Sequence, residues 1–174
     1  LWFKDRIANK CFEESTTIVP ICKYLKEIVE ERYPKKSVEV LYQGIDPSKW
    51  FETKGMKLKH PCVGLVQSAS IWGKTQELLL LPKILEAMPN VMFYWVGDGV
   101  YANKIIPLLK KYKNFEWLGY LEYPNKVREF LDEIDVYALM SGIDMSPLTL
   151  QEAQLMKKPV IATNVGGIPE LMVE

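Results

Sequence analysis

Short apolar runs rich in β-branched and aromatic residues alternate along this chain with stretches of helical periodicity. Such alternation is typical of βαβ units, in which helices join parallel strands. The sequence therefore predicts an α/β fold, with a parallel sheet and helices on both faces. Strands are predicted at residues 17–22, 38–42, 62–67, 91–96, 115–118, 135–140 and 159–162, and helices at residues 74–88, 101–112 and 147–157.

The segment at residues 46–60 interrupts this pattern, because it has no sustained period and contains an Asp-Pro-Ser turn signal. Lysines cluster at residues 54–59, where a solvated loop is the simpler interpretation than a phosphate site. We interpret the segment as a hinge or linker.

Composition narrows the class of protein. The chain has 174 residues, of which 48% are hydrophobic, and its 22 basic residues balance 22 acidic ones. This is enough apolar material for a buried core and argues against disorder. The zero net charge removes the usual electrostatic basis for binding nucleic acid, so we expect no nucleic-acid partner.

Cysteine usage and apolar run lengths bear on location. Cys11, Cys22 and Cys62 are odd in number and lack C-x-x-C spacing, which favours a reducing compartment. No apolar run approaches the roughly 18 residues of a membrane span, and no signal-peptide pattern opens the chain. The chain begins without methionine and stops as a helical pattern begins, so we expect an excised piece of a longer, cytoplasmic protein.

The most specific pattern lies at residues 141–170. A helix predicted to open at Pro147, with Ser146 as its N-cap, follows a strand directly. The unbonded N–H groups of Leu148 and Thr149, together with the helix dipole, form an anion site suited to a diphosphate.

Two acids flank this anion site. Asp144 lies in the loop before the helix, and Glu152 lies on the helix face that carries Thr149. A carboxylate just past a diphosphate can accept hydrogen bonds from ribose hydroxyls. Taken by themselves, both acids also fit the simpler interpretation of solvated surface groups.

A second glycine pattern offers an alternative. Residues 97–102, Gly-Asp-Gly-Val-Tyr-Ala, fit the dinucleotide-binding fingerprint after a strand and before a helix. The acid expected at the end of the next strand is absent, because Glu116 lies within that strand. We therefore interpret the glycines as a tight turn and keep NAD binding as the minor alternative.

These motifs together resemble the C-terminal half of the family 4, or group 1, glycosyltransferases. The family hallmark is E-x7-E after a strand, and Asp144 and Glu152 have that spacing. Residues 158–163 (Lys-Pro-Val-Ile-Ala-Thr) and 166–170 (Gly-Gly-Ile-Pro-Glu) match the elements that follow. Weaker marks are Gly-Ile-Asp at residues 44–46, Val-Gly-Asp-Gly at residues 96–99 and Leu-Gly at residues 118–119.

The resemblance implies a Rossmann-like sheet, the nucleotide-binding half of the two-domain GT-B architecture. Residues 1–47 would be the tail of the N-terminal domain with the inter-domain hinge. Residues 48–174 would be the nucleotide-sugar-binding C-terminal domain, truncated at its end.

The resemblance also implies roles for individual residues. Glu152 would bind the ribose of the donor, and Asp144 the hydroxyls of the transferred sugar. Lys74 would offset the charge of the leaving diphosphate, which Pro147, Leu148 and Thr149 would hold.

The sugar itself would lie against a glycine loop. Gly166 and Gly167 lack a Cβ, so their backbone would approach the sugar closely. Tyr120, just past a strand's carboxyl end, is a candidate for lining the base pocket.

The chain departs from the family pattern at two places. Asp144 stands where the family usually has Glu, which shortens the reach of the side chain by one methylene. Gln67 and Ser68 replace the family's Gly-Arg pair, so one cation is missing from the diphosphate site. The Ser68 hydroxyl can substitute for it only as a weaker, neutral donor.

Two further residue types are assigned to structure. His60, the only histidine, has no evident partner in the sequence, so we expect a surface histidine without a catalytic or metal role. Trp95 and Trp117 fall in predicted strands and are expected in the core.

The leading hypothesis is that the chain is the donor-binding domain of a retaining glycosyltransferase. The enzyme would move a hexose, with mannose among the candidates, from a UDP-, GDP- or ADP-sugar to a sugar, lipid or glycan acceptor. The resemblance implies no cofactor and no essential metal, and the sequence contains no Asp-x-Asp metal motif. It also leaves open a peripheral contact of the missing domain with the inner membrane face. The alternatives are a degenerate GT-B module that binds nucleotide sugar without transferring it, and a sugar-nucleotide epimerase.

Overall fold

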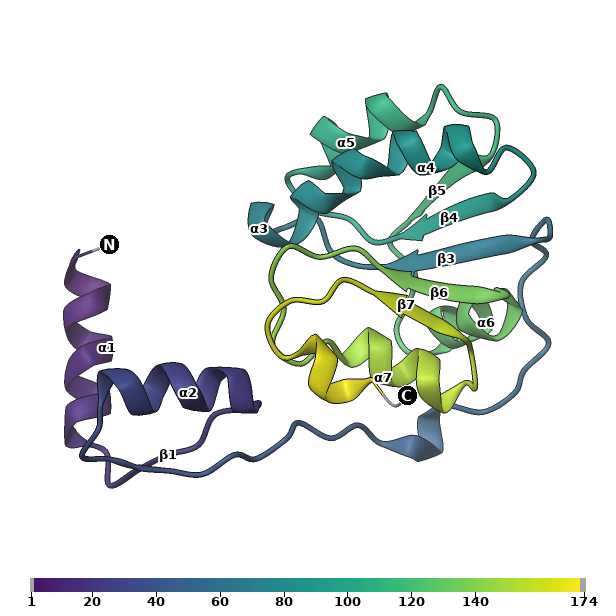
Figure 1. The fold of residues 1–174 in the computed structure, drawn as a ribbon. Helices are drawn as coiled ribbons and strands as arrows, with labels where there is room; N and C mark the ends of the chain where they lie inside the picture. Colours follow the sequence, from purple (N-terminus) through teal and green to yellow (C-terminus); the bar gives the residue numbers. More distant parts are fainter. Residues whose placement is uncertain (1, 173–174) are drawn as a thin grey trace.

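A five-stranded parallel sheet forms the main body of the computed structural model, which describes residues 2–172 (Figure 1). The strand order is β5-β4-β3-β6-β7. The strands are β3 (Cys62–Val66), β4 (Met92–Val96), β5 (Phe115–Gly119), β6 (Val136–Leu139) and β7 (Val160–Ala162). The predicted α/β class and parallel sheet are therefore confirmed.

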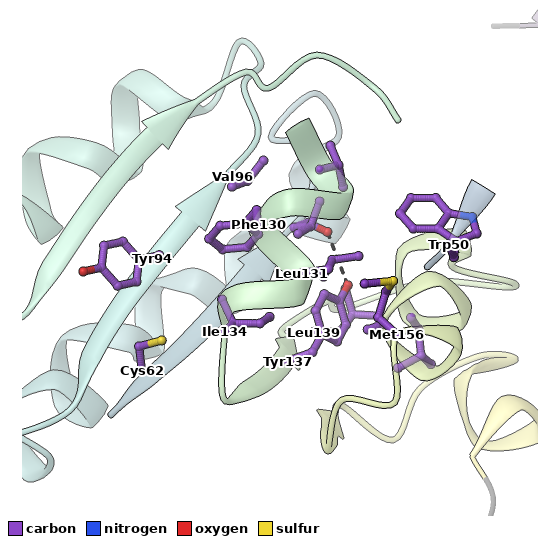
Figure 2. Close-up of a cluster of buried hydrophobic side chains, with 14 of the residues drawn as sticks. Trp50, Cys62, Tyr94, Val96, Phe130, Leu131, Ile134, Tyr137, Leu139 and Met156 are labelled. Carbon is purple, nitrogen blue, oxygen red and sulfur yellow. Dashed lines mark hydrogen bonds between the residues drawn. The ribbon is translucent and has the colours of Figure 1, made fainter. Parts of the chain in front are cut away.

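Helices cover both faces of this sheet (Figure 1). The first face carries α3 (Trp72–Thr75), the 3-10 helix η2 (Gln76–Leu80), α4 (Leu81–Ala87) and α5 (Ala102–Leu109). Apolar side chains of η2, α4 and α5 pack in one cluster with Leu65 and Trp95. The second face carries α6 (Asn125–Glu133) and α7 (Leu148–Leu155). Figure 2 shows this second layer, in which Phe130 and Leu131 of α6, and Ile134 just after it, lie beside Tyr137 of β6.

The predicted helix at residues 74–88 is broken into α3, η2 and α4. Pro82 stands in the first turn of α4, and its missing N–H interrupts the helical hydrogen-bond ladder there. The helix predicted from Pro147 begins one residue later, at Leu148. Pro147 itself is the N-cap, with an extended ψ of 112°, so the prediction of Ser146 as the cap is wrong.

Residues 2–44 form a smaller unit beside the sheet. It contains α1 (Trp2–Glu14), α2 (Lys23–Arg32) and a two-stranded parallel sheet of β1 (Thr17–Ile18) and β2 (Ser37–Val38). In Figure 1 these helices stand on the side toward which the strands of the main sheet point. The strands predicted at residues 17–22 and 38–42 are thus much shorter than expected.

The predicted linker is anchored rather than loose. After the short 3-10 helix η1 (Pro47–Lys49), Trp50 is only 6% exposed and belongs to the apolar layer of α6 and α7. Arg128 of α6 donates to the Lys49 carbonyl at 2.8 Å, and the Thr53 hydroxyl donates to Asp132 at 3.0 Å. Burial of the Trp50 side chain and these two hydrogen bonds anchor a segment whose sequence has no helical or strand periodicity.

The order of the strands creates a crevice. From β3 the chain runs outward through β4 and β5, and then returns to the other side of β3 as β6 and β7. The loops that follow β3 and β6 therefore leave the sheet in opposite directions. In open α/β sheets such a switch point, at the carboxyl ends of the strands, is where ligands bind.

The N-terminal unit is held to the main body by Glu170. Its carboxylate accepts the backbone N–H groups of Lys23 and Tyr24, at 2.8 and 2.9 Å, and the hydroxyl of Tyr42 at 2.9 Å. It thus caps the start of α2 from a distant part of the chain. Burial opposes ionisation of Glu170, but these hydrogen bonds outweigh it and lower its pKa.

We predict that Glu170→Ala lowers the free energy of unfolding by about 1 kcal/mol at neutral pH, the usual cost of a lost N-cap. Because the folded-state pKa is lowered, this contribution is present at neutral pH and is lost as the pH falls through that pKa. Chemical denaturation of both proteins along a pH series measures the difference. The exposed carboxylate of Glu27 on α2 provides the control variant, Glu27→Ala, and equal losses in both variants would contradict the capping role.

Candidate functional site

A pocket of about 300 Å³ opens at the switch point between the loops after β3 and β6. It brings together six of the residues that the sequence selected. These are Ser68, Lys74, Asp144, Pro147, Leu148 and Thr149. Residues more than 70 positions apart in the sequence therefore line one pocket.

An ion pair crosses the pocket. Lys74 Nζ lies 2.8 Å from Asp144 Oδ2, and the side chain of Asp144 is only 12% exposed. The other carboxylate oxygen, Oδ1, accepts the backbone N–H of Met145 at 2.9 Å. Asp144 thus holds the ammonium group of Lys74 at the pocket, and an entering anion competes with this carboxylate.

Thr149 presents its hydroxyl at the start of α7. The buried hydroxyl of Tyr137 donates to Thr149 Oγ1 at 2.7 Å, which leaves the Thr149 hydrogen for a ligand. Burial raises the pKa of Tyr137, so its phenol stays protonated and remains a donor. The first N–H groups of α7 also lack carbonyl partners within the helix and lie beside the pocket.

Glu152 lies behind the pocket rather than on its wall. Its side chain is 1% exposed, and Oε1 accepts the hydroxyl of Tyr123 at 2.9 Å. Oε2 is buried and has no hydrogen-bond partner among residues 2–172. Burial raises the pKa of Glu152, and the hydrogen bond from Tyr123 only partly offsets this. The interpretation of Glu152 as a solvated surface acid is therefore wrong.

The glycine loop contacts the other pocket loop instead of lining the pocket. Gly167 N donates to the Asp144 carbonyl at 3.0 Å. A Cβ at Gly166, where φ is +56°, would overlap the Asp144 carbonyl, and one at Gly167 would overlap that of Met145. The absence of a Cβ lets this loop support the backbone around Asp144.

The pair that replaces the family's Gly-Arg has structural partners. Gln67 is 9% exposed, and its side-chain amide both donates to Met140 O, at 3.0 Å, and accepts from Met140 N, at 3.2 Å. The Ser68 hydroxyl donates to Ser70 Oγ at 2.8 Å. The roles of Gln67, Tyr123 and Tyr137 were missed because their partners lie far away in sequence.

Two other expectations concern residues after β4 and β5. Tyr120 is 74% exposed and does not line the pocket. The turn at residues 97–99 is hydrogen-bonded to the loop after β3, where Ala69 N donates to the Asp98 carbonyl at 2.9 Å. The glycines of this turn therefore have the structural role predicted for them. Trp95 is fully buried, whereas Trp117 is only partly buried.

His60 has partners that the sequence did not reveal. It is exposed, as predicted, but its ring nitrogens lie 2.9 Å from Asp135 and 3.0 Å from Glu133. Glu133 ends α6 and Asp135 lies just before β6, 73 and 75 residues away in the chain. The expectation that His60 has no partner is therefore wrong.

The fold and the pocket together define an α/β domain that presents a lysine, a helix N-terminus and a hydroxyl to an anion. Comparison with known families makes this specific, because residues 62–174 match the family described as glycosyl transferases group 1. The chain belongs to this family.

Two curated relatives are longer proteins. The chain is 23% identical over 143 residues to the O-antigen biosynthesis glycosyltransferase WclY of Escherichia coli, covering 79% of this chain and 40% of that protein. It is 26% identical over 148 residues to N-acetyl-alpha-D-glucosaminyl L-malate synthase of Bacillus anthracis, covering 80% of this chain and 39% of that protein. The chain thus spans less than half the length of these two relatives.

Solved structures agree on the fold. Anabaena HepE, solved in complex with UDP and glucose, superposes with a TM-score of 0.75 at 19% identity, over 97% of this chain and 50% of that one. Sucrose-phosphate synthase of Thermosynechococcus elongatus gives a TM-score of 0.81 at 16% identity, over 97% and 45%. The fold is that of the C-terminal half of a GT-B glycosyltransferase, as the resemblance implied. Within residues 2–172, no helix combines the length and the apolar character needed to cross a bilayer.

The burial of Glu152 leads to a prediction. At neutral pH, Glu152→Gln should leave the unliganded chain as stable as the wild type or more so, because it removes a carboxylate from an apolar environment. The folded-state pKa of Glu152 is raised, so the wild type loses stability as the pH rises through it, and the advantage of the variant should grow in that direction. Thermal unfolding along a pH series measures this.

The control for that experiment is Glu152→Ala, which also removes the carboxylate but leaves a cavity and should be less stable than Glu152→Gln. A large loss of stability in Glu152→Gln at neutral pH would show instead that the carboxylate stabilises the unliganded fold.

Proposed function

We propose that this chain is the donor-binding domain of a retaining glycosyltransferase, which takes a hexose from a nucleoside diphosphate sugar. The observation that carries the proposal is the convergence of Lys74, Asp144 and the N-terminus of α7 on one pocket at the switch point of the sheet. The complex of the neighbouring HepE with UDP and glucose supports a uridine nucleotide among the candidate donors.

In this proposal the diphosphate lies against the N-terminus of α7. The N–H groups of Leu148 and Thr149 and the Thr149 hydroxyl donate to its oxygens. Lys74 offers the positive charge that stabilises the diphosphate as the bond to the sugar breaks, because charge develops on that leaving group. Ser68 is the remaining polar side chain on the β3 side of the pocket.

Asp144 and Glu152 have separate roles in the proposal. Asp144 contacts the transferred sugar, and its pairing with Lys74 couples sugar and phosphate recognition. Glu152 binds the ribose through Oε2, the oxygen without a partner. Because that oxygen is buried, ribose binding requires Tyr123, which is 53% exposed, to move from above the carboxylate.

Residues 1–47 would belong to the other domain and the hinge, and residues 48–174 to the donor domain. The smaller N-terminal unit exposes apolar side chains, among them Ile7 at 50%, Val19 at 51% and Leu41 at 68%. Such exposure supports a further packing partner for this unit. The acceptor site would lie in that other domain.

Nucleotide binding is the first test. UDP at about 100 times its dissociation constant should stabilise the chain by about 2.7 kcal/mol, which for this size raises the melting temperature by roughly 5 to 10 °C. A thermal-shift titration with UDP, GDP and ADP measures the effect and ranks the bases. The absence of a shift with all three nucleotides would contradict the proposal.

Lys74 provides the matched test of the site. Lys74→Ala should weaken nucleotide binding by roughly tenfold or more, because a charge-assisted hydrogen bond is worth about 1.5 to 3 kcal/mol. Lys126→Ala is the control, since it removes one lysine and one ion pair, with Glu129, from the exposed surface of α6. Calorimetric titration of both variants distinguishes a specific site from a general charge effect, which would weaken binding equally in both.

A binding module without transfer activity is the second candidate, favoured by the absence of the family's arginine at Ser68. We expect the 174-residue chain to bind donor but not to transfer sugar, because the reactants must be held in register by both domains. Glycosyl transfer by this chain alone, measured with a radiolabelled donor, would contradict this. Failure of the full-length protein to transfer would favour the binding module.

A further inference from the structure

A second polar cluster lies at the opposite edge of the sheet from the nucleotide pocket. His60 and Cys62 lie at the amino end of β3, Glu133 is the last residue of α6, and Asp135 lies between α6 and β6. Three potential metal-ligand atoms lie within 4.8 Å of one another: a ring nitrogen of His60, the sulfur of Cys62 and a carboxylate oxygen of Asp135. Neither the pocket nor the proposed glycosyl transfer uses these residues.

The distances between these donor atoms are close to those of a shared ligand sphere. Cys62 Sγ lies 3.7 Å from His60 Nδ1, and Asp135 Oδ2 lies 2.9 Å from the same nitrogen. Tetrahedral coordination at ordinary zinc–ligand distances separates a histidine nitrogen and a cysteine sulfur by about 3.5 Å, and a nitrogen and a carboxylate oxygen by about 3.4 Å. Two of the three separations thus lie within about 0.5 Å of the tetrahedral values, and the third, between Cys62 Sγ and Asp135 Oδ2, is at most 4.8 Å.

The other ring nitrogen of His60 has the partner that a metal-binding histidine usually has. Nε2 lies 3.0 Å from Glu133 Oε1, so it can donate its proton to that carboxylate while Nδ1 faces Cys62 and Asp135. A carboxylate on the far nitrogen fixes the tautomer and orientation of a ligating imidazole. The contact between His60 Nε2 and Glu133 involves a residue that is not itself one of the three ligands, and it is a second observation in favour of a bound cation.

We propose that His60, Cys62 and Asp135 bind a divalent metal ion of the zinc type, with Glu133 orienting His60. The mixed nitrogen, sulfur and oxygen set suits a borderline ion such as Zn²⁺ better than Mg²⁺ or Ca²⁺, which prefer oxygen. His60 and Asp135 are 40% and 46% exposed, so an ion enters from solvent and keeps a water as its fourth ligand. Binding releases the Cys62 thiol proton, and any proton on His60 Nδ1, to solvent.

A metal there would join the start of β3 to the start of β6. The backbone N–H of Cys62 already donates to Asp135 Oδ2 at 2.7 Å, so the ion adds to an existing contact between these strands. The role of such a site is structural. It is independent of the proposed glycosyl transfer.

The experiment uses the reduced, metal-free 174-residue chain with Zn²⁺ and Co²⁺ as probes. Calorimetry should show one Zn²⁺ site, and Co²⁺ should give a thiolate-to-cobalt charge-transfer band in the near ultraviolet. Cys62→Ser should abolish that band, and Glu133→Gln should weaken Zn²⁺ binding about 10- to 100-fold, the usual effect of losing an outer-sphere carboxylate. Cys11→Ser, which removes an exposed thiol on α1, should change neither result.

Because Cys62 is buried, Cys62→Ser can fail to fold. His60→Gln changes an exposed side chain and provides the second variant, which should lose Zn²⁺ affinity at least tenfold while keeping its circular dichroism spectrum. Absence of Zn²⁺ binding by the wild type, or equal affinity in His60→Gln, would overturn the proposal. The stability difference between the wild type and His60→Gln is also measured in chelator and in Zn²⁺. An equal difference in the two conditions would overturn the proposal too, because the cluster would then stabilise the fold through its hydrogen bonds alone.

Discussion

The side-chain amide of Gln67 holds together the two strands whose separation creates the pocket at the switch point. The registered pairs of β3 and β6 end at Gly64 and Tyr137, and beyond them the loops diverge. Gln67 bridges the gap with hydrogen bonds in both directions to the Met140 backbone, and it also donates to the Lys74 carbonyl at 3.2 Å. One neutral side chain therefore fixes the start of both loops, and with them the positions of Lys74 and Asp144.

The pair that replaces the family's Gly-Arg contributes no positive charge to the pocket. An arginine at the end of β3 could pair with an anionic ligand, whereas Gln67 hydrogen-bonds to the Met140 backbone and Ser68 to Ser70. Lys74 is thus the cationic side chain that lines the pocket, and Asp144 holds it when no ligand is bound. The pocket-lining side chains of Ser68, Lys74 and Asp144 have partners within the chain. Oε2 of Glu152, which lies behind the pocket, has none among residues 2–172.

The sequence predicted the parallel sheet well, because the sheet depends on local patterns, and six of the ten predicted site residues line one pocket. Apolar runs located the five central strands, and the acid spacing with the following helix located Asp144 and Thr149. Long-range partners could not be predicted in this way. Nothing near Glu152 in the sequence indicates that Tyr123 covers it, nothing near His60 indicates Asp135, and Pro82 divides a helix whose apolar period continues through it.

The glycine pair illustrates the same difference. The resemblance implied that the backbone of Gly166 and Gly167 approaches the transferred sugar closely. In the structure, both glycines lie close to the backbone of Asp144 and Met145. A glycine pattern in the sequence indicates a close backbone contact, but it does not indicate whether the neighbour is a ligand or another part of the chain.

The most direct test of the shared site is amide NMR of the isotopically labelled chain during titration with UDP. A single site at the switch point predicts that the resonances of Ser68, Leu148 and Thr149 shift together along one saturation curve, while those of Cys62 and Asp135 at the far edge do not move. Shifts centred on the turn at residues 97–102, without change at Leu148 and Thr149, would contradict the account and return the fold to the dinucleotide alternative.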